Sequence, residues 1–327
     1  MLHPLVPPVT DWFSVAGRPL PWRAAGCSPW GVLVSEVMLQ QTPVARVEPR
    51  WRAWQERWPL PADLASASPA DVLRAWGGLG YPRRALRLQE CAVVLVREHD
   101  GAVPADEEAL LGLPGVGTYT AAAVLAFAFG RRSVVLDTNV RRVLARALDG
   151  IARPPAHLGA AELRRAGAVV PDDDAQAAEW NAGVMELGAL VCTARAPRCA
   201  ECPLADRCAW LAAGSPPDAH SSSRRRQAWA GTDRQARGRV MALLREAAGD
   251  VSAEAVAAAW PDEEQRRRVL AGLVADGLAE TTHGPGTATD EAVRAPAAGV
   301  VGYRLPAVRS TAGGASASRP SSTEADP

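Results

Sequence analysis

Apolar residues recur every three or four positions from residue 11 to about residue 211, and this spacing predicts a succession of helices. Alternation of apolar and polar positions, which is typical of a half-buried strand, is nearly absent here. Prolines and glycines punctuate the joints. The predicted helices span residues 30–41, 70–76, 83–99, 107–111, 118–129, 140–148, 161–168 and 176–191. The pattern therefore predicts an all-α fold for about two thirds of the chain.

The amino-acid composition changes after about residue 211. Glycine, serine, proline and a short arginine run predict a linker over 213–236, and a Ser/Ala/Gly-rich stretch predicts a disordered tail over 307–327. Between them, residues 237–306 predict a small α+β unit similar to a winged helix. Its expected elements are helices over 239–248, 253–260 and 263–278 and a strand over 299–305.

The composition restricts the chemistry that the side chains can perform. The chain of 327 residues has 36 basic residues, and all of them are arginine. Without lysine, no side-chain amine can act as a nucleophile or form a Schiff base. An equal number of acidic residues makes the net charge zero, so binding to nucleic acid must depend on local patches. The longest uncharged stretch, 109–130, is broken by Pro114 and glycines, so we expect no membrane span.

Four of the six cysteines lie within 17 residues, at Cys192, Cys199, Cys202 and Cys208. Four thiolates this close predict a metal centre, either zinc or a [4Fe-4S] cluster. A zinc site usually has two C-x2-C pairs, and this segment has only one. The spacing resembles the iron–sulfur loop of the endonuclease III and MutY superfamily of DNA glycosylases. That resemblance implies a [4Fe-4S] cofactor.

A glycine-rich turn over 113–117 links two predicted helices. Gly115 and Gly117 leave backbone N–H groups uncovered at a helix N-terminus, which suits a DNA phosphate, although many helix pairs use such a turn only for packing. Twenty residues later, Asp137 or Asn139 is placed to cap the next helix, and capping alone would explain the aspartate.

Together the turn and Asp137 resemble the helix-hairpin-helix signature of the same superfamily, over residues 10–212. The resemblance implies two helical domains, 22–134 and 1–21 with 135–212. It also implies that Asp137 stabilises the oxocarbenium-like sugar, and we expect the helix dipole to keep its carboxylate charged. Endonuclease III-like lyases carry a lysine two residues after the hairpin glycine, where this chain has Tyr119. The resemblance therefore implies a monofunctional glycosylase.

Glu36 lies within the apolar helix predicted over 30–41, so we expect it to be partly buried, with a raised pKa that retains a proton near neutral pH. Pairing with Arg46 is the structural alternative. The string Ser-Glu-Val-Met-Leu-Gln-Gln-Thr over 35–42 is similar to that of the MutY family. The resemblance implies that Glu36 protonates N7 of adenine.

The same family comparison indicates DNA contacts. Pro43 ends the helix after Leu39, Gln40 and Gln41, which are placed to enter the base stack. Tyr81 matches a tyrosine that stacks beside 8-oxoguanine. Core packing is the alternative for Leu39 and Tyr81.

Four further residues match positions around the adenine pocket, and they are Arg18, Trp22, Arg23 and Glu186. The resemblance thus implies an adenine glycosylase, which we expect to be monomeric and nucleoid-associated, that acts on duplex DNA with A:8-oxoG or A:G mispairs. The first 12 residues lack a basic start followed by an apolar run, so we expect no secretory signal and a cytoplasmic location. The family's MutT-like domain is missing from 222–305, which leaves Tyr81 and Gln41 to recognise 8-oxoguanine, with the terminal unit supplying phosphate contacts. A mismatch thymine or uracil glycosylase and a non-catalytic iron–sulfur DNA-binding or redox-sensing protein are the alternatives.

Overall fold

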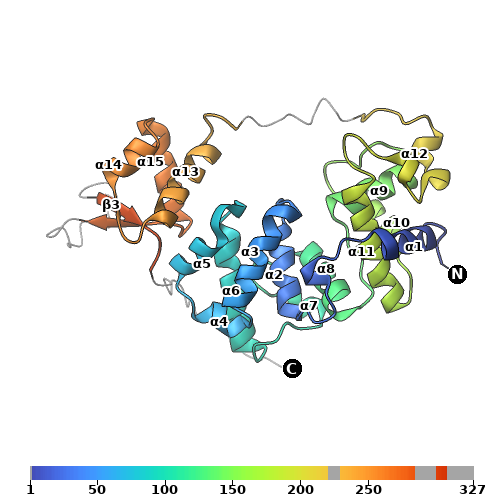
Figure 1. Cartoon of the computed structure of the whole chain (residues 1–327), viewed down its shortest axis with the longest axis horizontal. Coiled ribbons are helices and arrows are strands. Elements are labelled where there is room, and N and C mark those ends of the chain that lie inside the picture. Colours follow the sequence, from blue (N-terminus) through green and yellow to red (C-terminus); the bar gives the residue numbers. More distant parts are fainter. Residues whose placement is uncertain (1, 220–228, 284–299, 308–327) are drawn as a thin grey trace, which may run out of the picture.

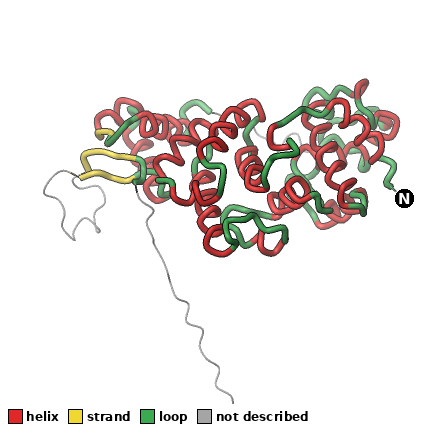
Figure 2. The backbone as a smooth tube through the Cα atoms, turned by 60° about the horizontal axis from the view of Figure 1, so that its bottom comes forward, coloured by secondary structure: helices red, strands yellow, loops and turns green. Residues whose placement is uncertain are grey.

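The computed structural model describes residues 2–219, 229–283 and 300–307, and it is mostly helical. Figure 1 shows three groups of elements along the long axis: a central helical group, a second helical group beside the N-terminus, and a small C-terminal unit at the opposite end. Figure 2 shows that the described strands are confined to that C-terminal unit. The predicted fold class, all-α with a small α+β unit, is confirmed.

The central group contains the hairpin and the helix that carries Glu36. Its elements are η1 (Pro21–Arg23), α2 (Pro29–Leu39), α3 (Val44–Arg57), α4 (Pro61–Ser66), α5 (Pro69–Trp76), η2 (Gly77–Leu79), α6 (Arg83–Glu98), α7 (Glu107–Leu111) and α8 (Thr118–Phe129). Proline in the first turn begins α2, α4 and α5, where its missing N–H costs no helical hydrogen bond. Ser28 and Ser68 cap α2 and α5 by accepting a backbone N–H.

Helices α3 and α4 were absent from the predicted elements. Pro43 precedes α3 as its N-cap, and Pro49 lies inside the helix. Val47, Trp51 and Trp54 are buried on one face at three- and four-residue spacing. Burial of these large side chains offsets the helical hydrogen bond that a proline cannot donate.

The second helical group joins the beginning of the chain to residues beyond the hairpin. It consists of α1 (Val6–Ala16), α9 (Thr138–Ala147), α10 (Ala160–Val169), α11 (Asp174–Leu190), η3 (Cys199–Glu201), η4 (Ala205–Arg207) and α12 (Ala209–Ala212). Helix α1 packs against α11 although the two are far apart in sequence. Helix α1 was also absent from the predicted elements, and prolines occupy its first turn, where proline is tolerated.

The C-terminal unit contains α13 (Asp233–Glu246), β1 (Val251–Ser252), α14 (Ala253–Ala259), α15 (Glu263–Ala275), β2 (Glu280–His283) and β3 (Val300–Arg304). Within the described residues the strands form an antiparallel sheet in the order β1-β3-β2. Helix α13 begins before residue 237 because Thr232 accepts the N–H of Gln235 as N-cap, so the predicted linker end at 236 is wrong. Residues 220–228 of the linker and 308–327 of the predicted tail lie outside the described residues.

Apolar side chains of the described residues form two large clusters. One joins α2, α3, α5, α6 and α8, and the other joins α1, α9, α10 and α11. This grouping supports our proposed division into 22–134 and 1–21 with 135–212. Residues of α13 to α15 belong to the first cluster, so the C-terminal unit shares the core of the central helices. No described helix combines the length and apolar character that a membrane crossing requires.

Candidate active site

Glu36 lies in the middle of α2 with 4% of its surface exposed. The hydroxyl of Tyr119, from the first turn of α8, donates a hydrogen bond to its Oε2 at 3.0 Å. Burial raises the pKa of Glu36 from 4.5 to about 7; the Tyr119 hydrogen bond opposes the rise and the charge of Asp137 adds to it. The alternative pairing with Arg46 is wrong, because Arg46 donates to the carbonyl of Gly78.

Tyr119 is held as a neutral hydrogen-bond donor. Burial raises its pKa well above 10, and the neighbouring charges of Glu36 and Asp137 raise it further. Helices α2 and α8 pack together, which brings the two side chains into contact across 83 residues of sequence. The pair therefore places a carboxyl group of intermediate acidity and a neutral phenol side by side.

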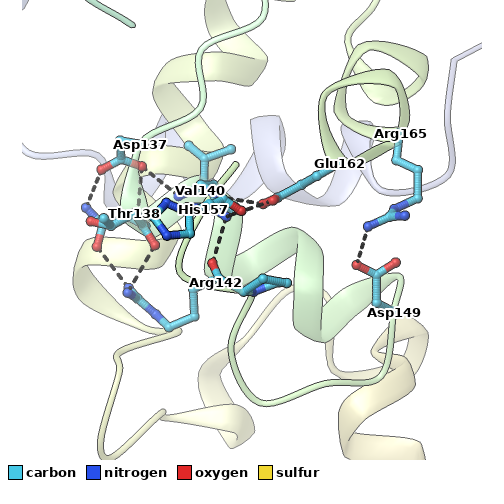
Figure 3. Close-up of polar contacts among 11 residues, drawn as sticks. Asp137, Thr138, Val140, Arg142, Asp149, His157, Glu162 and Arg165 are labelled. Carbon is cyan, nitrogen blue, oxygen red and sulfur yellow. Dashed lines mark hydrogen bonds and ion pairs between the residues drawn. The ribbon is translucent and has the colours of Figure 1, made fainter. Parts of the chain in front are cut away.

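Asp137 is the N-cap of α9 (Figure 3). Its Oδ1 accepts the backbone N–H groups of Asn139 at 2.8 Å and Val140 at 2.6 Å, and its Oδ2 accepts the Asn139 side-chain amide at 2.6 Å. We expected the helix terminus to favour the charged carboxylate. Burial is nevertheless the largest influence and raises the pKa of Asp137, while these hydrogen bonds oppose the rise.

Arg142 links the Asp137 cap to the cysteine loop. Its Nη2 donates to Asn139 Oδ1 at 2.9 Å and to the carbonyl of Gly188 at 2.7 Å, while its Nε donates to the carbonyl of Cys192 at 2.7 Å. Only 8% of Arg142 is exposed. Sequence reasoning missed this residue, because helical spacing puts Arg142 on the side of α9 away from Val140, Val143 and Leu144 and gives no sign of its burial.

The four clustered cysteines line one small cavity together with the apolar side chains of Val191, Trp210 and Leu211. Arg146, also missed from sequence, donates from Nη1 to Cys192 Sγ at 3.3 Å. Burial raises the pKa of Cys202 to about 11 and that of Cys199 above its usual value, so the thiolate forms need a cationic partner. Among the described residues, no three Cys, His, Asp or Glu side chains converge on a single-ion site. Four thiols around a cavity, with an arginine donor beside them, suit a polynuclear cluster.

Glu186 on α11 is 1% exposed and neutralised by two arginines. Arg18 donates to it from Nε at 2.5 Å and Nη2 at 2.9 Å, and Arg23 lies 3.1 Å from its Oε2. Trp22, between these arginines in sequence, is 5% exposed and packs edge-to-face on Trp51. The structure therefore brings Arg18, Arg23 and Glu186 together in an ion-pair cluster and buries Trp22 against Trp51.

The predicted base-stack residues lie at the end of α2 and on the turn before α6. Helix α2 ends at Leu39, which packs partly against the core, and Gln40 Nε2 lies 3.5 Å from Thr120 Oγ1. Gln41 is exposed, with a φ of 56° in the left-handed region. Tyr81 is 45% exposed with a φ of 47°, so its alternative placement in the core is wrong.

Arg84 supports this surface, although sequence reasoning did not select it. Its Nη1 donates to the carbonyls of Val37 and Gln40, both at 2.7 Å, and its guanidinium lies 5.6 Å from the centre of the Tyr81 ring. These contacts satisfy carbonyl groups at the C-terminus of α2. Arg84 thus ties the turn over 40–42 to Tyr81.

The hairpin turn between α7 and α8 has the open backbone that the sequence predicted. Gly115 adopts a φ of 81°, and a Cβ there would lie 3.2 Å from Cβ of Arg87. Gly117 is the N-cap of α8, and a Cβ added to it would meet no atom within 4 Å. Space is therefore free beside the first N–H groups of α8, as a phosphate contact requires.

Comparison with known proteins identifies relatives of this site. The family described as HhH-GPD superfamily base excision DNA repair protein matches residues 34–165, and the iron-sulfur binding domain of endonuclease III matches 192–208. The chain is 52% identical to an adenine DNA glycosylase of Mycolicibacterium smegmatis, over 83% of this chain and 91% of the relative. It is 53% identical to an adenine DNA glycosylase of Mycobacterium tuberculosis, over 83% and 88%. A solved thermostable thymine-DNA glycosylase covers 64% of the chain and 95% of its own length, with a TM-score of 0.59 and 27% identity.

Proposed function

The chain belongs to the adenine DNA glycosylase family, and on that premise we propose that it removes adenine mispaired with 8-oxoguanine or guanine from duplex DNA. The reaction is hydrolysis of the N-glycosidic bond in base excision repair, and it leaves an abasic site. Adenine must leave the base stack first, which costs a few kcal/mol and less at a mispair. We place this monomeric enzyme at the nucleoid.

Glu36 is the proposed acid. Adenine is a poor leaving group until N7 is protonated, and a carboxyl group with a pKa of about 7 holds a proton at neutral pH while remaining acidic enough to donate it. The Tyr119 hydroxyl, 3.0 Å from Oε2, orients that carboxyl group. Protonation at N7 draws electrons from the bond between N9 and C1′, which then breaks.

Asp137 is the proposed electrostatic partner. As adenine leaves, positive charge develops on the sugar, and a carboxylate fixed by three hydrogen bonds stabilises that charge without reorganising. Water then adds to C1′ and loses a proton. Because Tyr119 stands where lyases carry a lysine, we propose that the enzyme does not cleave the strand.

The proposed DNA contacts use the exposed surface near the site. Gly115 and Gly117 open the hairpin to a phosphate, Leu39 with Gln40 and Gln41 faces the gap left by adenine, and Tyr81 meets the opposite base. We keep Asn139 as a positioning residue through its hydrogen bond to Asp137. Arg18, Arg23 and Glu186 are proposed to shape the adenine pocket as an ion-pair cluster instead of contacting the base directly.

The cysteine loop is the [4Fe-4S] cluster site. Cys192, Cys199, Cys202 and Cys208 hold the cluster, which serves as a structural support. We propose that Arg142 then anchors the Asp137 cap against a fixed loop. Iron and sulfide analysis of anaerobically purified protein, together with its absorbance, tests the assignment, and one zinc per chain without iron would contradict it.

The contact between buried Glu36 and Tyr119 carries the proposal. We expect purified protein to release adenine from duplexes with A:8-oxoG and A:G, and to nick the strand only after alkali. T:G and U:G duplexes test the thymine glycosylase alternative, to which the similarity with a solved thymine-DNA glycosylase draws attention. Excision only from T:G or U:G would support that alternative, and no excision from any duplex would favour a non-catalytic protein.

A further inference from the structure

The C-terminal unit packs against the central helices beside the proposed DNA surface. Its helix α13 packs against α5 and η2, and its apolar residues continue the core of the central group. Arg83 Nη1 of α6 lies 3.2 Å from Asp276, which also accepts from Arg237 at 2.5 Å. Figure 1 shows the unit next to α5, at the end of the molecule opposite the cysteine loop. The first turn of α13 therefore has a defined position relative to Tyr81.

Arg234, in that first turn, contacts Tyr81 across 153 residues of sequence. Its Nη2 donates to the Tyr81 hydroxyl at 2.5 Å, and its guanidinium carbon lies 5.3 Å from the ring centre. Both side chains are exposed, so a DNA strand can approach the pair. Arg84 contacts the same ring from the central group. The ring is therefore oriented by one arginine from each part of the molecule.

Tyr81 combines an unfavourable backbone conformation with an exposed side chain. Its φ of 47° lies in the left-handed region, which costs energy for a residue with a Cβ, and 45% of the residue is exposed to solvent. An exposed tyrosine loses rotamer freedom when it stacks on a base, whereas a ring already held by a hydrogen bond and a cation–π contact has less freedom to lose.

We propose that Arg234 is a positioning residue that holds Tyr81 ready for the base opposite adenine. The C-terminal unit thereby influences selection of the opposite base through one side chain, without a base pocket of its own. This inference rests on the proposed function and changes the role expected for the terminal unit. An arginine that only neutralised a phosphate would add affinity without selectivity.

The test is a double-mutant cycle of Arg234→Ala and Tyr81→Phe. Single-turnover adenine excision and DNA affinity are measured on A:8-oxoG and A:G duplexes. We expect each single variant to lower the A:8-oxoG to A:G ratio roughly three- to tenfold, and the double variant to lower it little further, because both remove the hydrogen bond between Arg234 and the Tyr81 hydroxyl. Arg234→Lys keeps the charge but loses the planar donor, so it should not restore the ratio.

Arg239→Ala is the matched control, since Arg239 is an exposed arginine on the same helix. It should lower affinity on both duplexes equally and leave the ratio unchanged. Additive single effects, or full rescue by Arg234→Lys with a reduced salt dependence in Arg234→Ala, would overturn the inference in favour of a phosphate contact.

A binding arm separates this inference from the proposed function. The same variants in a Glu36→Gln background are titrated with both duplexes, so that selectivity is read as a ratio of Kd values without turnover. A wild-type chain that excises adenine from neither duplex would refute the function. An unchanged ratio for Arg234→Ala in both arms would refute the inference alone.

Discussion

Glu36 and Glu186 are both glutamates on helices and both are almost completely buried, at 4% and 1% exposure. Burial raises the pKa of each, but their partners differ. Glu36 has a neutral phenol and the like charge of Asp137 nearby, and its pKa rises to about 7. Glu186 accepts hydrogen bonds from Arg18 and faces Arg23, which together outweigh burial and lower its pKa. The partners therefore separate a group that can give a proton from one that stays charged and supports the structure.

Replacing Glu36 by Gln gives the largest expected effect. The amide keeps the shape but cannot protonate N7, so single-turnover adenine excision should fall by about 10²–10⁴-fold. Affinity for A:8-oxoG duplex and the thermal unfolding temperature should stay near those of the wild type. Excision within a few fold of wild type would show that this carboxyl group is not the acid.

Asp137→Asn should reduce excision by about 10²–10³-fold, because the charge that faces the developing sugar cation is lost. Asparagine is as good an N-cap as aspartate, so α9 should remain folded. Circular dichroism and DNA affinity provide the control. An active Asp137→Asn protein would reduce Asp137 to a helix cap.

Glu186→Gln should act mainly on stability, because Glu186 neutralises two arginines and takes no part in the proposed proton transfer. Loss of one partner leaves the arginines uncompensated, and the free energy of unfolding should fall by about 3 kcal/mol at neutral pH. Because the folded pKa of Glu186 is lowered, its contribution is present above pH 4.5 and is lost as the pH falls through the folded value. The difference between variant and wild type in urea unfolding should therefore shrink in acid. A pH-independent difference would contradict the ion-pair account.

The pH dependence of excision gives a graded effect that is small within one pH unit of neutrality. Glu36 must be protonated, so the single-turnover rate should fall about tenfold per pH unit above its pKa of about 7. Because the folded pKa of Glu36 is raised, its contribution to the free energy of unfolding is fully present below pH 4.5 and is lost as the pH rises through about 7. This pH dependence is opposite in direction to that of Glu186. A rate that stays constant to pH 9 would separate Glu36 from the proton transfer.

Much of this site could be predicted from the sequence because its signals are local. An apolar helix predicted the burial of Glu36, and Asp137 stands directly before the helix that it caps. The contact between Glu36 and Tyr119 depends on how α2 packs on α8, which helical periodicity does not specify. Trp22 stays a predicted pocket residue, and its edge-to-face contact with Trp51 is likewise a matter of packing that the sequence does not specify.

Prediction of the fold from the sequence is limited in the same way, because it also depends on tertiary packing. Helices α1 and α3 were not predicted, and both contain prolines, whose effect depends on position within a helix and on the apolar area that the helix buries. Arg84 and Arg234 are ordinary charged residues in the sequence, and only the tertiary structure brings both to Tyr81.

The most direct measurement is a carboxyl-carbon NMR titration of protein labelled with 13C-glutamate, with resonances assigned by Glu36→Gln and Glu186→Gln. We expect the Glu36 carboxyl group to titrate near pH 7 and the Glu186 carboxyl group to titrate below pH 4.5. A Glu36 midpoint at or below 4.5 would contradict the central claim that its surroundings make it the proton donor.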